Sequence, residues 1–164
     1  MPGISATSLE ATSQVCEHAR VMRDVDLGVH LEGLGRAIGE RESAHTEDLA
    51  RARVRAEALH AEVESALRRF HAALEAAGAS QLRVEQGRVR IDDKHLRSVE
   101  FDLCRGRHRA VVVVKSRGEV TLVGPFRVGK AEGPCRSFPI DDDEELAPAL
   151  ASFLGDFVEA AATP

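Results

Sequence analysis

The segment GPFRVGKA, residues 124–131, comes within one residue of the phosphate-binding pattern GxxxxGK[ST] and follows an apolar run that resembles a strand. In such a loop, glycines turn backbone N–H groups toward the phosphates, a helix begins there, and a Ser or Thr hydroxyl holds Mg²⁺. Here Ala131 replaces that hydroxyl, Pro125 lacks an N–H group, and Gly133-Pro134 cannot open a helix. We therefore interpret the segment as a loop at the edge of a sheet, and we predict no nucleotide or other cofactor.

Two E-x-x-H pairs, Glu42/His45 and Glu57/His60, each place a carboxylate and an imidazole on adjacent turns of a helix. Di-metal carboxylate bundles use this spacing, but they take the pairs from two helices and add glutamates from two more. The heptad pattern places His60 just outside the apolar seam, facing solvent. The remaining histidines have no ligand spacing with one another or with the cysteines, so we predict a charged surface and no metal site.

Two of the three cysteines have an arginine as the next residue, at Cys104-Arg105 and Cys135-Arg136. A neighbouring cation can lower the pKa of a thiol, although strand alternation could equally bury Cys104. The odd number and wide spacing favour reduced, mostly buried thiols. Because no acid, base and nucleophile converge in the sequence, we expect no enzyme.

A basic stripe in the middle of the chain mostly alternates with apolar residues, so several of its members could share one outer sheet face. Its members are Arg83, Arg88, Arg90, Lys94 and Arg97. A basic stripe is typical of phosphate binding, but single-strand binders also present aromatic platforms, and this chain has six Phe and no Trp or Tyr. We favour a solvated face or a salt-bridged subunit contact over a nucleic-acid interface.

The composition, with 43% hydrophobic and 30% charged residues among 164, is typical of a globular protein in water. The longest apolar run is far shorter than the roughly 20 residues that span a bilayer, and the N-terminus resembles no secretory signal. We therefore expect a cytoplasmic protein with no membrane partner. The charge is uneven: residues 79–140 carry 13 Lys/Arg against 7 Asp/Glu, whereas residues 141–164 carry none against 7.

The first 78 residues contain the helical part of the chain. A seam of apolar residues recurs there with 3,4 spacing, and many of its members are alanines that allow a partner helix to approach closely. The seam consists of Leu49, Ala52, Ala56, Leu59, Val63, Ala66, Phe70 and Ala73. An earlier seam of Leu27, Leu31, Leu34 and Ile38 has a different phase. The change of phase predicts a break between Gly39 and Asp48, and therefore a helical hairpin or coiled coil.

From residue 79 to 140 the apolar period changes from 3.6 to 2, and short turns separate the runs. This pattern predicts an antiparallel meander of four or five strands, in which Val111 to Val114 is apolar on both faces. A strongly amphipathic helix then follows DDDEE, with a regular helix starting late because of Pro148. We expect this C-terminal helix to pack on the sheet.

The sequence thus predicts an α+β fold with a helical segment, 1–78, and a sheet segment with its helix, 79–164. Our first hypothesis is a non-catalytic assembly or adaptor protein, a homo-oligomer and most simply a dimer, which self-associates through the seam and binds a protein partner through its sheet. The alternatives are a small-molecule sensor with an apolar cavity between sheet and C-terminal helix, and a nucleic-acid binder that uses the basic stripe.

Overall fold

The computed structural model describes residues 26–92, 97–129 and 133–163, and these residues form an α+β fold, as predicted. The helices are α2 (Leu27–Ala76), the short 3-10 helix η1 (Ser80–Leu82) and α3 (Asp143–Ala162). The strands are β1 (Glu85–Gln86), β2 (Arg90–Ile91), β3 (Ser98–Arg105), β4 (His108–Lys115), β5 (Glu119–Arg127) and β6 (Cys135–Pro139).

The sheet is antiparallel throughout and runs in the order β1-β3-β4-β5-β6, with β2 pairing the same edge of β3 as β1 does. Strands β3, β4 and β5 follow one another through tight turns at Gly106 and Gly118, both of which have positive φ angles. Because turns of two or three residues join only antiparallel neighbours, the meander follows directly from the sequence.

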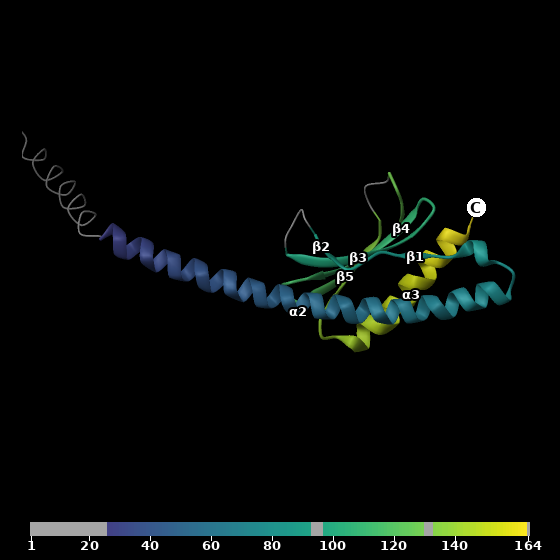
Figure 1. Cartoon of the computed structure of the whole chain (residues 1–164), viewed down its shortest axis with the longest axis horizontal. Coiled ribbons are helices and arrows are strands. Elements are labelled where there is room, and N and C mark those ends of the chain that lie inside the picture. Colours follow the sequence, from purple (N-terminus) through teal and green to yellow (C-terminus); the bar gives the residue numbers. More distant parts are fainter. Residues whose placement is uncertain (1–25, 93–96, 130–132, 164) are drawn as a thin grey trace, which may run out of the picture. The chain divides into compact units, whose positions relative to one another are not determined.

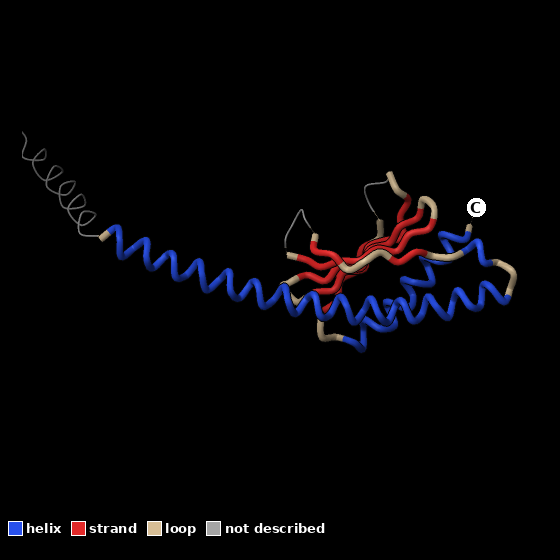
Figure 2. Tube along the Cα trace, in the orientation of Figure 1, coloured by secondary structure: helices blue, strands red, loops and turns tan. Residues whose placement is uncertain are grey.

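Contacts divide the chain into one unit that ends at Ala44 and a second that begins at His45, which we call the sheet unit. The second half of α2 therefore belongs with the sheet, although its composition resembles that of the preceding residues. In the sheet unit, α2 and α3 lie on the same side of the sheet (Figures 1 and 2).

The core of the sheet unit lies between these two helices and the inner face of the sheet. Alternate residues of β3, β4 and β5 point into it, and α3 contributes the apolar face that its sequence predicts. The central members are Val99, Phe101, Leu103, Val112, Val114, Val120, Leu122, Leu146, Leu150, Phe153 and Phe157. The expectation that the C-terminal helix packs on the sheet is confirmed.

The predicted helical hairpin is not confirmed, because α2 is helical without interruption through residues 39–48. The segment contains no proline, and its Glu, Arg and Ala residues favour helix, so the change of apolar phase does not require a turn. An apolar pattern shows which side of a helix is covered, but not what covers it. A continuous helix whose two halves are covered on different sides shows the same change of apolar phase as a helical hairpin does.

The sheet differs from the predicted meander in three places. Strands β1 and β2 do not form a hairpin with each other, because both pair with β3. Residues Gly124 to Arg127, interpreted above as part of a loop, extend β5. The additional strand β6 pairs with β5 despite its flanking prolines, which an edge strand tolerates. The sheet accordingly has six strands instead of four or five.

Helix α3 begins before Pro148 and not after it. The side chain of Asp142 accepts a hydrogen bond from the backbone N–H of Glu145 and caps the helix, and three acidic residues follow in the first turn, where the helix dipole stabilises them. Pro148 is exposed, so the carbonyl that loses its helical partner there can be hydrated.

His71, near the end of α2, links that helix to the chain entering β1, because its Nε2 accepts a hydrogen bond of 3.1 Å from the backbone N–H of Val84. The ring can accept only when Nε2 is unprotonated. Burial, together with the positive charge of Arg83, lowers the pKa of His71. The unfolded chain therefore binds more protons at this position than the folded protein does.

By linkage, the stabilisation from His71 is fully present above its unfolded pKa, near 6.5, and is lost as the pH falls from that value through the lower pKa of the folded protein. We expect the free energy of unfolding, measured with urea between pH 8 and pH 5, to fall less steeply in His71→Gln than in the wild type. His30→Gln, on an exposed part of α2, is the control. A wild-type slope in His71→Gln would contradict this role.

Candidate functional site

Neither E-x-x-H pair contributes to a group of three or more metal-binding side chains, and the described residues contain no such group. The prediction that His60 faces solvent is wrong. Its Nε2 lies 3.0 Å from the carbonyl oxygen of Gly87, and its ring meets that of Phe101 edge-on at 5.1 Å. Glu57 pairs with Arg53 on the surface of the same helix. His60 therefore holds α2 against the sheet.

The basic stripe does not form one continuous cationic face in the structure. Arg90 binds Glu100 at 2.8 Å and Asp102 at 3.1 Å, so its charge is neutralised within the chain. Arg83 follows η1, while Arg88 and Arg97 are exposed at or near the β1 and β2 edge. The remaining member, Lys94, lies outside the described residues. An extended phosphate-binding track gains no support from this arrangement.

Cys104 and Cys135 are free thiols on two strands that β4 and β5 separate. Burial and the neighbouring carboxylate of Glu85 raise the pKa of Cys104, which is opposite to the direction that its sequence neighbour Arg105 suggested. A raised pKa keeps the thiol protonated and makes it a poorer nucleophile. Cys16 lies outside the described residues.

The predicted helix seam packs against the sheet of its own chain. Ala52, Ala56, Leu59 and Val63 are buried in the core, and Leu49 and Phe70 are partly buried beside it. Two predicted members, Ala66 and Ala73, are exposed, and Leu67 is buried instead. A straight α-helix drifts away from a strict seven-residue repeat, and a sheet does not require the repeat that a supercoiled partner helix imposes.

The outer face of the sheet carries no helix among the described residues of the sheet unit, and we call it the open face (Figure 1). Its centre is apolar or small, and its residues align across the strands in two rows. The rows are Glu100, Val113, Thr121 and Ser137, and Asp102, Val111, Val123 and Cys135. The three valines are half-buried by their neighbours.

The charges along one side of the open face are paired with each other. Asp102 accepts from Arg90 and also from Arg109, at 3.4 Å. At one end, Glu119 binds Arg117 at 2.5 Å and Lys115 at 3.4 Å. A hydrogen bond from Ser137 and these two cations lower the pKa of Glu119. The open face thus has an apolar centre inside a border of satisfied charges.

The earlier seam, Leu27, Leu31, Leu34 and Ile38, is the largest group of exposed apolar side chains on one face of a described helix, and we call it the apolar stripe. Its members are between 44 and 67% exposed. Every described residue up to Ala44 is exposed. The 4,3,4 spacing of these residues predicts the apolar face, but the predicted hairpin assigned it a partner helix in the same chain.

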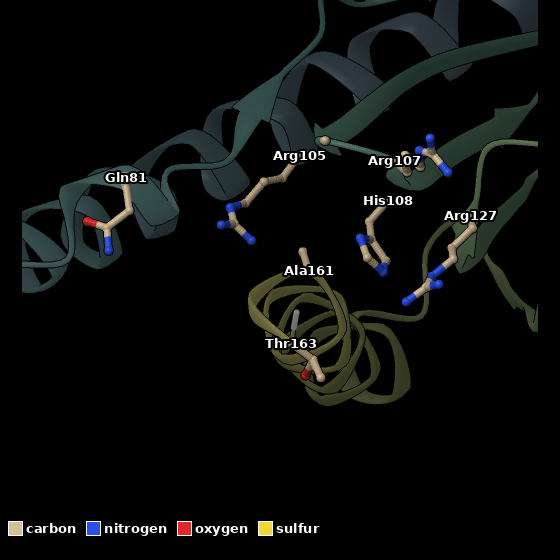
Figure 3. Close-up of a pocket in the computed structure, with 8 residues that line it drawn as sticks. Gln81, Arg105, Arg107, His108, Arg127, Ala161 and Thr163 are labelled. Atoms are coloured by element: carbon tan, nitrogen blue, oxygen red, sulfur yellow. The ribbon is translucent and has the colours of Figure 1, made fainter.

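A further feature is a hollow of about 450 Å³ between the end of the sheet and the C-terminal end of α3. We call it the cationic hollow, because three arginines and a histidine line it (Figure 3). The lining residues are Gln81, Arg105, Gly106, Arg107, His108, Arg127, Ala161 and Thr163. No spacing in the sequence predicts this cluster, because it forms only when strand pairing aligns the ends of β3, β4 and β5.

Comparisons with protein-family models, with curated proteins and with solved structures find no match to this chain. Of the helices in the described part of the chain, none is both long enough and apolar enough to span a bilayer.

Proposed function

We propose that this protein is a non-catalytic assembly module that forms a homodimer through the apolar stripe of α2. The observation that supports it is the exposure of Leu27, Leu31, Leu34 and Ile38 on one helix face with 4,3,4 spacing. This spacing forms the contact line of two helices that pack along each other. A second copy of the chain offers the same stripe.

The helix that carries the stripe also needs a partner for its own stability. Most helical stability in proteins comes from the packing of an apolar face, and every described residue of α2 up to Ala44 is exposed. Each glycine in this part of the helix, at positions 28, 33, 35 and 39, costs up to about 1 kcal/mol relative to Ala. Burial of the stripe against a second copy would offset that cost. The glycines would also let the two backbones approach closely.

We further propose that the open face receives a protein partner. Val111, Val113 and Val123 provide an apolar centre, and the surrounding carboxylates are already paired with arginines of the same chain. The core of a protein interface is depleted in charge in this way, while its rim is polar. The partner that fits this face presents an apolar patch and needs no strong charge of its own.

The two other hypotheses have weaker support. The space between the sheet and α3, where a sensor cavity was expected, is filled by Leu150, Phe153 and Phe157. Nucleic-acid binding through the basic stripe is disfavoured by the internal pairing of Arg90.

A substitution in the apolar stripe tests the dimer directly. We expect Leu31→Glu to weaken self-association at least about 30-fold, because a side chain at the centre of an interface contributes about 2 kcal/mol. The matched control is Val29→Glu, since Val29 is 61% exposed on the opposite side of the same helix. Sedimentation equilibrium would measure both variants.

A third variant, Val113→Glu on the open face, separates the two proposed surfaces. We expect it to leave the dimer intact while its melting curve reports that the sheet unit is folded. Dissociation by Val113→Glu together with an unchanged Leu31→Glu dimer would place self-association on the sheet and overturn the assignment of the apolar stripe.

A further inference from the structure

The cationic hollow brings together guanidinium groups that no other part of the described structure neutralises. Arg105 ends β3, Arg107 lies in the turn after it, and Arg127 ends β5. Within the described residues, none of the three side chains donates a hydrogen bond or forms an ion pair. Elsewhere on the same sheet, Arg90, Arg109 and Arg117 all bind carboxylates.

Strand pairing fixes the positions of these groups. His108 is the direct cross-strand partner of Arg105 on one side and of Arg127 on the other. In Figure 3, Arg105, His108 and Arg127 are directed toward the space above the end of α3, whereas Arg107 is directed away from it. Arg105 and Arg127 therefore lie one strand to either side of His108, and two guanidinium groups on the same side of the sheet repel each other unless an anion lies between them.

The end of α3 does not account for the cluster. The last turn of α3 has no basic residue of its own, and its C-terminal carbonyls carry a partial negative charge. However, the hydroxyl and backbone N–H of Thr163 both donate to the carbonyl of Glu159, and none of the three guanidinium groups bonds to a carbonyl of this helix. Their donors therefore remain available to a ligand.

We propose that the cationic hollow binds a phosphate-type oxyanion, either inorganic or as the terminal group of a small phosphorylated molecule. Arginine presents planar pairs of donors that match phosphate oxygens, and several arginines together stabilise a dianion that one could not. The described lining contains no acidic side chain to repel such a ligand, and Gln81 adds a neutral hydrogen-bonding group. This inference is independent of the proposed dimer.

A small ligand fits this site better than a nucleic acid does. The hollow is short, and the next arginine along β4, Arg109, is engaged by Asp102. A nucleic acid would require a row of free cations along its backbone. The cluster instead concentrates its charge at one point, between the sheet end and α3.

Calorimetric titration of the full chain with inorganic phosphate and with pyrophosphate, at constant ionic strength in chloride, tests the site. We expect saturable binding of one anion per chain, tighter for pyrophosphate, and weakened about tenfold or more by Arg105→Gln or Arg127→Gln. Arg105→Lys, which keeps the charge but loses the planar donor pair, should lose less. Arg88→Gln, at an exposed arginine that does not line the hollow, should bind as the wild type does.

Three results would overturn the proposal. The first is no saturable binding of either anion at millimolar concentration by wild-type protein whose melting curve shows that it is folded. The second is an equal loss in Arg88→Gln and in the two hollow variants. The third is tighter binding of a single-stranded oligonucleotide than of pyrophosphate, with a steep dependence on salt and on Arg88. Preference for a phosphorylated sugar over pyrophosphate would identify the phosphorylated small molecule as the source of the anion.

Discussion

Replacing Phe101 with alanine should lower the free energy of unfolding by about 3–5 kcal/mol, the range for a fully buried aromatic side chain. Phe101 lies in the middle of β3, opposite Val112, and no part of it is exposed. Its ring also meets the edge of the His60 ring from α2. The substitution therefore removes apolar contact within the sheet and the ring contact between the sheet and α2.

Urea unfolding followed by circular dichroism would measure this loss, with Val54→Ala as the control. Val54 lies on α2, the helix that carries His60, and its side chain is 68% exposed. Its truncation should change the free energy of unfolding by no more than about 0.5 kcal/mol. A loss below about 1 kcal/mol in Phe101→Ala would contradict the burial of this side chain in the core of the sheet unit.

Gly124→Ala should be the second most damaging substitution, with a loss of about 2–4 kcal/mol that combines backbone strain and overpacking. Gly124 has a φ angle of +110°, which L residues rarely adopt. A methyl group there would lie 3.0 Å from the carbonyl oxygen of Arg109 and 3.2 Å from the Cα of Ala110, both on the neighbouring strand. A backbone neighbour cannot rotate away as a side chain can.

Gly129 provides a matched control, because its φ angle is +98° but a methyl group there would have no neighbour within 4 Å. Gly129→Ala should therefore show the backbone strain alone, about 1–2 kcal/mol. The difference in unfolding free energy between the two variants measures the close approach of β4 and β5. Equal losses in the two variants would remove the steric part of this explanation.

The local pattern was sufficient to predict the α+β class, the β3–β4–β5 meander and the amphipathic face of α3. Strand alternation and the two turn glycines determine the first two, and the spacing of Leu146, Leu150 and Phe153 determines the third. In these elements the residues that determine the structure are close together in the chain. Their local pattern therefore predicts the element without knowledge of a distant partner.

The errors arose where a distant partner decides the outcome. The residues around Gln86-Gly87 read as a hairpin, but β1 and β2 both pair with β3 because its long edge offers more hydrogen-bonding groups than either short strand. Strand β6 was missed because prolines surround it, and only its position at the edge makes them acceptable.

The same limit applies to the candidate sites. The heptad reading of the seam correctly found an apolar helix face, but an apolar face does not say whether a helix or a sheet covers it. The structure covers Leu59 and Val63 with the sheet of the same chain, so the proposed dimer contact shifts to the apolar stripe. Arg105 and Arg127 are 22 positions apart, and no spacing rule could have joined them.

The mass of the unmodified full-length chain in solution tests the proposed assembly most directly. Sedimentation equilibrium over a concentration series should give a mass approaching twice the 17.8 kDa of one chain, with dissociation on dilution. A mass of 17.8 kDa that stays constant up to about 100 μM would contradict the dimer, because a contact weaker than that contributes less than about 5–6 kcal/mol of association free energy.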